Sequence, residues 1–306
     1  MKKFKKIIRA VLVLAVLAGL IYLIPKVITV VRLKRAADSY VAASSVSTFK
    51  DSKTTIIYDT NDQELCTMKN TKDMYYVSYQ EIPVTLVNSF VVMEDRQFYK
   101  HSGYDIKAIL RAIVINQKSN DIAQGASTIT QQLARNIFLS QEVTWQRKVE
   151  EIFIAVGLEK KYSKNQILEF YLNNIYFGNG YYGVEAAARG YFDKSVSELT
   201  LAEQTFIAAI PNNPTRYNPL TNYDNTVQRK NLILQQLYEA DDIGSLDRYM
   251  AETEEVVLNP HQTEEINNSV VTYARHCATE SLMSVSGFTF RYNFSSEDDY
   301  NAYEAT

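Results

Sequence analysis

Two adjacent carboxylates, Glu94 and Asp95, end an apolar run and are followed by His101 a short way along the chain. Carboxylates at the end of a helix are usually solvated, because charged groups are rarely buried without a partner. A carboxylate held at the end of an apolar helix can also act as a general base toward a bound substrate. From these residues alone, both interpretations stay open.

Two further groups of polar side chains recur at helical spacing. The first group is Gln131, Gln132, Arg135 and Asn136, preceded by Ser127 and Thr128. In the second group, Glu151 lies four residues after Arg147 and three after Lys148, which puts all three on one side of a helix. A solvated ion pair, contributing under about 1 kcal/mol, is the alternative interpretation.

Together, these groups indicate one kind of chemistry. Two separated carboxylates are typical of enzymes that act on glycosidic bonds. Clustered Arg and Lys side chains neutralise a departing phosphate or pyrophosphate, which then leaves without being protonated. The combination favours glycosyl transfer from a lipid pyrophosphate over hydrolysis of a glycan.

The elements that must position these side chains are mostly helical. Apolar periodicity predicts a helix that ends at Glu94 and another that begins at Asp105. Three capping boxes mark further helix starts, at Thr128, Ser163 and Thr200. Two β-leaning runs on either side of residues 59–62 predict a hairpin.

Charge and hydropathy divide the chain unevenly. The net charge of the 306 residues is −3, but nine Lys and Arg residues and no acids lie in the first 35, so the remainder is acidic and argues against nucleic acid as a partner. Residues 10–31 form an apolar stretch of the length that a membrane span needs. A cleaved secretory signal is the alternative, and both place the body of the protein outside the cytoplasm.

The predicted organisation has five parts: a cytoplasmic tail (1–9), a transmembrane anchor (10–31), a stalk with a β-hairpin (32–74), a helical catalytic domain (75–240) and a linker or the start of a further domain (241–306). Cys66 and Cys277 form either one long-range disulfide or two free thiols. Ser47–Lys50 reads "STFK", as at the nucleophile of serine transpeptidases, but the companion motifs are absent and we assign it no chemistry.

Five ordered motifs resemble those of the peptidoglycan glycosyltransferases, the lysozyme-like family found in monofunctional transglycosylases and in the N-terminal half of class A penicillin-binding proteins. The resemblance covers residues 80–235, about half of the chain. The motifs are "EDRQFYKHSG" (94–103), "GASTITQQLARN" (125–136), "RKVEE" (147–151), "KNQILEFYLNNIYFGNGYYGVEAAARGYF" (164–192) and "LTLAEQTFIAAIPNNPTRYNP" (199–219).

The resemblance implies a mainly α fold, with a lysozyme-like glycosyltransferase domain behind one N-terminal transmembrane helix and a short β-containing stalk. It implies polymerisation of lipid II into β-1,4-linked glycan, with inversion at the donor C1 and release of undecaprenyl pyrophosphate. The expected location is the bacterial cell membrane, with the N-terminus cytoplasmic and the catalytic domain outside. Lipid II, the growing glycan and the membrane are the expected partners; cell-wall synthesis proteins and a divalent cation (Mg²⁺ or Mn²⁺) stay open.

The resemblance also assigns roles to residues. Glu94 would be the general base and Glu151 the carboxylate that assists departure of the pyrophosphate. Cations would bind the pyrophosphate, and polar side chains would orient it or the sugars. The expected substrate-binding residues are Asp95, Phe98, His101, Ser127, Thr128, Gln132, Arg135, Asn136, Arg147 and Lys148. Of these, Asp95, Phe98 and His101 would support Glu94, with a purely structural role still open for Asp95 and His101.

This sequence departs from the family pattern at Arg135, where Lys is more usual, so the geometry of the donor site could differ. Two rival functions stay open: a muramidase of the same fold and a non-catalytic scaffold of the cell-wall machinery. A muramidase would have little use for the cluster of Arg and Lys. A scaffold would not need Glu94 or Glu151, and both are present.

Overall fold

The computed structural model describes residues 2–50, 55–58, 60, 64–68, 73–111, 127–140, 142–260, 269–285 and 296. They belong to two compact units: Met1–Lys53 with Lys72–His261, and Thr54–Thr71 with Gln262–Thr306. We call these the large unit and the small unit.

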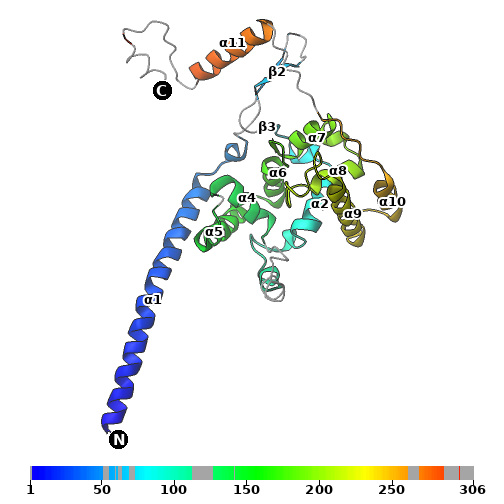
Figure 1. Cartoon of the computed structure of the whole chain (residues 1–306). Coiled ribbons are helices and arrows are strands. Elements are labelled where there is room, and N and C mark those ends of the chain that lie inside the picture. Colours follow the sequence, from blue (N-terminus) through cyan, green and yellow to red (C-terminus); the bar gives the residue numbers. More distant parts are fainter. Residues whose placement is uncertain are drawn as a thin grey trace. The chain divides into compact units, whose positions relative to one another are not determined.

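The large unit is mainly α-helical, as predicted (Figure 1). Its α-helices are α1 (Lys2–Ala43), α2 (Val84–Glu94), α4 (Ile129–Phe138), α5 (Trp145–Lys161), α6 (Lys164–Asn174), α7 (Val184–Phe192), α8 (Leu201–Ala208), α9 (Tyr223–Glu239) and α10 (Ser245–Thr253), and residues 106–111 are also helical. Short 3-10 helices are η1 (Ser47–Phe49), η2 (Tyr79–Glu81), η3 (Phe98–Lys100) and η4 (Val196–Glu198), and the strands β3 (Asp73–Met74) and β4 (Tyr181–Tyr182) pair in parallel.

Two groups of helices form the core of this unit. The helix α8 packs against α2 and α9, and nearly all of its side chains are buried, with Phe206 fully so. The helix α4 packs against α5 and α6 on the other side of the unit (Figure 1). The two groups meet at the C-terminal end of α2, where Gln132 of α4 hydrogen-bonds Glu94.

The predicted capping boxes at Thr128, Ser163 and Thr200 are all confirmed. In each box the hydroxyl accepts a hydrogen bond from the backbone N–H three residues on, and the side chain at that position bonds back to the capping residue. These caps satisfy N–H groups that the first turn of a helix would otherwise leave unpaired. Local sequence therefore fixes where α4, α6 and α8 begin.

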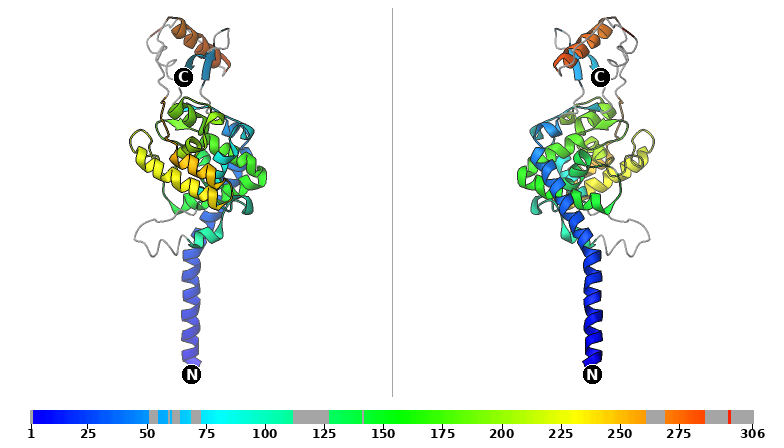
Figure 2. Two further views of the ribbon diagram at one scale, coloured as in Figure 1. Left: turned by 90° about the vertical axis from the view of Figure 1, so that its right-hand side faces the viewer. Right: turned by 90° about the vertical axis from the view of Figure 1, so that its left-hand side faces the viewer.

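The N-terminal helix α1, blue in Figure 2, is longer than the predicted span of residues 10–31 and continues through Ala43 into the segment assigned to the stalk. Lys161, at the end of α5, donates to the carbonyl oxygens of Val41 (2.7 Å) and Ala42 (3.3 Å). A cation at this end stabilises the helix by offsetting its partial negative charge. Gly157 leaves room for the approach, since a Cβ there would lie 2.7 Å from the Val41 side chain.

Among the residues that the structure describes, no helix meets the length and apolar content that crossing a membrane requires. The span at residues 10–31 stays a prediction.

The small unit contains the predicted hairpin. Strands β1 (Thr55–Tyr58) and β2 (Glu64–Met68) pair antiparallel, with Thr55 opposite Met68, and the helix α11 (Ser269–Val285) packs against both strands. The small unit thus joins part of the predicted stalk to part of the predicted linker, while α10 belongs to the large unit. Cys277 is a free thiol, and the side chain of Cys66 lies outside the described residues.

The segment "STFK" has a structural role in the large unit. Phe49 is buried and stacks on Phe170, with the ring centroids 4.1 Å apart. Lys50 lies 3.9 Å from the Glu169 carboxylate and 4.4 Å from the centre of the Tyr76 ring. These contacts join η1 to α6 within the large unit.

Candidate active site

Glu94 ends α2, and three other helices reach its carboxylate or its partners. From α4, Gln132 donates its amide N–H to Glu94 Oε2 at 2.8 Å. From α9, the Arg229 guanidinium lies 3.9 Å from Glu94 Oε1. From α6, the Tyr171 hydroxyl donates to Gln132 Oε1 at 3.1 Å, so the Gln132 amide can present only its NH₂ to Glu94.

Tyr171 is suited to be a permanent donor. It is 1% exposed, and burial raises the pKa of its hydroxyl well above the ordinary value. The negative charge of Glu94 raises this pKa further, while the nearby cation Arg135 opposes the shift. The hydroxyl therefore keeps its proton at any working pH, and Tyr171, Gln132 and Glu94 form a hydrogen-bonded chain of fixed direction.

Asp95 does not face the same way as Glu94, because it leaves the helix with an extended φ of −160°. Its Oδ2 accepts from His101 Nε2 at 2.8 Å and from the backbone N–H of Ile129 at 3.1 Å. Since His101 Nδ1 accepts from the Gly103 N–H at 3.1 Å, the ring proton sits on Nε2 and the neutral ring suffices. The Asp95 charge also lies at the positive end of α4.

Gly103 makes this junction possible. Its φ of +102° is in the region that favours glycine, and a Cβ would lie 2.8 Å from the backbone of Ala155 in α5. Its carbonyl oxygen accepts from Thr128 Oγ1 at 2.9 Å. The loop after Glu94 is thereby fastened to the first turn of α4.

A second charged group surrounds Glu151 in α5. This carboxylate is fully buried, with Lys148 Nζ hydrogen-bonded to one oxygen and Arg147 3.6 Å from the other. Lys148 also donates to Ser127 Oγ at 2.7 Å and is 39% exposed on its side chain. Lys148 therefore connects a buried carboxylate to a hydroxyl on the surface of the site.

Several polar atoms near this group have no hydrogen-bond partner among the described residues. They include Glu151 Oε2, Arg147 Nε and Gln131 Nε2, all buried. The side chains of Arg135 and Asn136 are half-buried on α4 and make no hydrogen bond or ion pair within the described part of the chain. Unpaired buried polar atoms are costly, so their concentration here is consistent with a site that binds a polar ligand.

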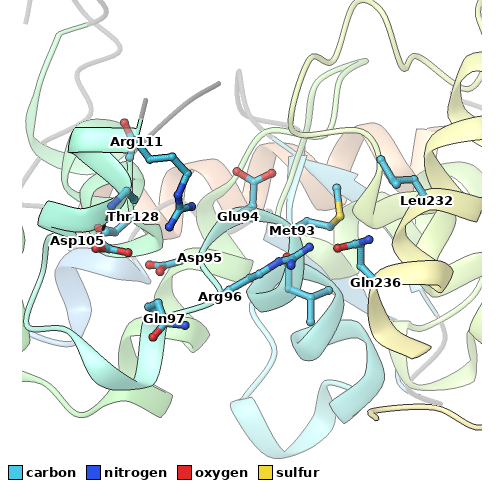
Figure 3. A pocket seen from close by; sticks show the side chains of 13 residues that line it. Met93, Glu94, Asp95, Arg96, Gln97, Asp105, Arg111, Thr128, Leu232 and Gln236 are labelled. Carbon is cyan, nitrogen blue, oxygen red and sulfur yellow. Dashed lines mark hydrogen bonds between the residues drawn. The ribbon is translucent and has the colours of Figure 1, made fainter. Parts of the chain in front are cut away.

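A cleft of about 600 Å³ opens beside Glu94. Figure 3 shows the Glu94 carboxylate between Arg111 on one side and Leu232 and Gln236 of α9 on the other. Ser127 and Thr128 line the same cleft, whereas Glu151 does not. Glu94 and Glu151 therefore do not line one cleft together. Glu151 is connected to the cleft through Lys148, which hydrogen-bonds both Glu151 and Ser127.

Sequence reasoning missed three cations of this region: Arg96, Arg111 and Arg229. Arg96 and Arg111 line the cleft, and Arg229 faces Glu94 from a helix far along the chain. Arg96 and Arg111 follow Glu94 closely in sequence and could have been included. Arg229 carried no local signal, because it sits in an ordinary polar stretch of α9.

Phe98 lies in the core and not in the cleft. It is fully buried, and Lys164 Nζ is 4.2 Å from the centre of its ring. Lys164 also donates to the His101 carbonyl oxygen at 2.8 Å. Phe98 and Lys164 thus support the loop that carries Asp95 and His101.

The structure gives no metal site of its own in the described residues, where no three His, Cys, Asp or Glu side chains gather as ligands. Glu151 is the acid nearest the basic cluster, but Lys148 and Arg147 already occupy its surroundings. This arrangement does not fit a dedicated Mg²⁺ or Mn²⁺ site, and we derive no chemical step through a metal.

Comparison with known proteins gives a consistent result. The family described as Transglycosylase matches residues 61–238. Penicillin-binding protein 4 of Bacillus subtilis is 43% identical over 215 residues, which are 70% of this chain and 34% of that protein. Penicillin-binding protein 1A of Escherichia coli is 42% identical over 222 residues, which are 72% of this chain and 26% of that protein.

Among solved structures, penicillin-binding protein 1A from Haemophilus influenzae is 20% identical, with a TM-score of 0.41 over 78% of this chain and 25% of that chain. The chain spans about a third or less of the length of these relatives.

Proposed function

The chain belongs to the transglycosylase family of peptidoglycan glycosyltransferases, and we propose that its cleft polymerises lipid II into β-1,4-linked glycan. The observation that carries the proposal is the Glu94 carboxylate, held in the cleft wall by Gln132 and Arg229. Lys148 and Arg147 lie at the start of α5, connected to the cleft through Ser127.

In the proposed step, Glu94 takes the proton of the acceptor sugar's 4-hydroxyl. The acceptor oxygen attacks C1 of the donor as the bond from C1 to the pyrophosphate oxygen breaks. The electron pair of that bond leaves with undecaprenyl pyrophosphate, and direct attack from the opposite face inverts C1. The chain tying Glu94 to Gln132 and Tyr171 would keep the base aimed at the acceptor.

The charge that develops on the leaving group needs cations in place before the reaction. Lys148 is the best placed, because its half-exposed ammonium already binds Ser127 and can turn toward a phosphate oxygen. Arg135 and Arg147 would complete the donor side. Glu151 would hold Lys148 and Arg147 in position, assisting departure indirectly.

Two groups of residues would act by position. Asp95 and His101 join the loop after Glu94 to the N-terminus of α4. Thr128, through Gly103, closes the same junction.

We propose that Arg96 and Arg111, on the cleft wall next to Glu94, bind the acceptor's own pyrophosphate.

The rival functions account less well for this geometry. A muramidase must protonate a sugar leaving group, yet Glu151 is fully buried and faces two cations that such a reaction does not use. A scaffold needs neither the buried Tyr171 hydroxyl nor the unpaired polar atoms around Gln131 and Glu151.

We also propose that the large unit works at the outer face of the bacterial cell membrane, where lipid II would reach the cleft.

The test is polymerisation of fluorescent lipid II by the full chain in detergent, with products separated on a gel. Wild type should form glycan ladders. Glu94→Gln should bind lipid II but form none, because the amide cannot take the proton. Glu255→Gln, which removes an exposed carboxylate, is the matched control and should polymerise normally.

A folded wild-type chain that binds lipid II without extending it would favour the scaffold. Release of sugars from purified cell-wall glycan would favour the muramidase. Ladders of normal length from Glu94→Gln would remove Glu94 from the role of base.

A further inference from the structure

The helix α10 exposes an apolar face. Leu246, Tyr249 and Met250 are 67%, 64% and 59% exposed, and their spacing puts them on one side of the helix. Ala251, on the opposite side, is buried where α10 packs against α9 and α8. Figure 1 shows α10 at the edge of the large unit, beside α9. Adjacent large apolar side chains on a surface are typical of binding sites.

A hollow lies next to this face. It has a volume of about 410 Å³, and Met250 and Ala251 of α10 form part of its wall. Thr85 of α2, Leu201 of α8 and Ile243 complete the apolar part of the lining. Such a hollow can hold an apolar side chain of another molecule, while the exposed side chains beside it contact the rest of that molecule.

Four acids ring the same hollow: Asp241, Asp242, Asp247 and Glu254. All four are exposed, and none forms an ion pair with a described residue. Their hydrogen-bond partners are neutral: Asn88 for Asp242, the Gly244 N–H for Asp247 and the Thr200 hydroxyl for Glu254. Partial burial raises the pKa of Asp242, the hydrogen bond from Asn88 opposes this shift, and the charge of Asp241 adds to it.

Neighbouring bases compensate this ring only in part, because the charge of Lys230 interacts with that of Glu254. Arg248 pairs with Glu252 at 2.7 Å on the far side of α10 from Leu246 and Met250. Lys230 is buried and donates to the Ala251 carbonyl oxygen at 2.7 Å. Within the described chain, the apolar face is thus bordered by three acids without an ion pair, Asp241, Asp242 and Asp247.

We propose that α10 and the hollow beside it bind a basic amphipathic segment of a partner protein. Apolar side chains of the segment would cover Leu246, Tyr249 and Met250, and one would enter the hollow. Lys or Arg side chains along its edge would meet the four acids. The negative charge around the hollow favours a basic partner over a neutral or acidic one.

This surface is separate from the catalytic cleft. Thr85 lies in the first turn of α2 and Glu94 ends it, so the two are about 13 Å apart along the helix. Binding at α10 therefore leaves the cleft open, and the proposal does not depend on the reaction. A partner bound here would recruit or place the enzyme.

The test is titration of the full chain, in a neutral detergent, with a synthetic amphipathic helix of leucine and lysine. The same helix with glutamate in place of lysine is the reference, and detergent alone is the blank. The lysine peptide should bind, weakening as salt rises, and the glutamate peptide should not. A photoreactive group on the lysine peptide should crosslink within α10.

Variants of the surface sharpen the result. Leu246→Ser with Tyr249→Ser should weaken binding by about tenfold or more, since buried anchors dominate such contacts. Asp241→Asn with Glu254→Gln should weaken it at low salt and flatten its salt dependence. Leu220→Ser, at a residue 50% exposed elsewhere on the unit, should change nothing. All variants should keep their unfolding temperature and their polymerisation rate.

Equal binding of both peptides, crosslinks outside α10, or full binding by the double-serine variant would each overturn the proposal. Self-association that is lost in the double-serine variant would also overturn it, because the occupant would then be a second copy of this chain.

Discussion

Replacing Tyr171 with Phe tests the most specific feature of the proposed active site. The change deletes only the hydroxyl that donates to Gln132 at 3.1 Å, and the ring stays packed in the core. Gln132 can then turn its carbonyl oxygen toward Glu94, which repels the carboxylate. A neutral hydrogen bond of this kind contributes about 0.5–1.5 kcal/mol, so kcat should fall about 2- to 12-fold while lipid II binding holds.

The matched control is Tyr191→Phe. Tyr191 is also buried, in a part of the large unit without cleft residues. Its hydroxyl donates to the Phe177 carbonyl oxygen at 2.8 Å and accepts from Asn179 Nδ2 at 3.0 Å. Both variants should lose unfolding free energy, Tyr191→Phe at least as much because two hydrogen bonds are lost, but only Tyr171→Phe should slow polymerisation. In a Gln132→Ala background, Tyr171→Phe should have no further effect on kcat, because the two residues act in series.

The measurement is the initial rate of lipid II polymerisation, read beside thermal unfolding of the same samples. Unchanged kcat in Tyr171→Phe, with stability lowered as in Tyr191→Phe, would refute the positioning role. The hydroxyl would then be only a buried group with a satisfied bond.

Further predictions concern other parts of the large unit. Arg229→Met removes a cation 3.9 Å from Glu94 and should lower kcat/KM by about tenfold, with Arg229→Lys intermediate; full activity in Arg229→Met would exclude a catalytic role. Gly103→Ala should destabilise the fold by more than about 1 kcal/mol, measured in urea, because φ is +102° and the added methyl meets α5; a neutral result would contradict the packing. Burial raises the pKa of Asp242 above 3.8, so its charge opposes folding above that pKa and this cost disappears as pH falls below the unfolded value. Asp242→Asn should therefore stabilise at pH 7, by under about 1 kcal/mol, and not at pH 3, as melting curves at both pH values would show.

The helix starts could be predicted because their determinants are local. Thr128 and Gln131 satisfy each other three residues apart, and no distant contact is needed. The helical last turns of α1, inside the segment assigned to the stalk, were not predicted for the opposite reason. Those turns depend on Lys161 and Gly157 of α5, which no reading of the Ser- and Ala-rich segment alone reveals.

The candidate active site shows the same difference between local and distant determinants. Glu94, Gln132 and the Lys148–Glu151 pair stood out because each belongs to a compact motif. Arg229 and Tyr171 did not, since their relation to Glu94 exists only once α6 and α9 pack near the end of α2. Burial of Glu151 away from the cleft was likewise invisible in the spacing of its neighbours.

The small unit has a consequence for the order of folding during synthesis. Its hairpin ends at Met68, and the helix that packs on both strands begins at Ser269, roughly 200 residues later. At about 5–20 residues per second, the ribosome needs about 10–40 s to supply that helix. The two strands therefore emerge well before the helix that packs on them, while residues 72–261 of the large unit are made, and their edges can pair with other chains during that interval.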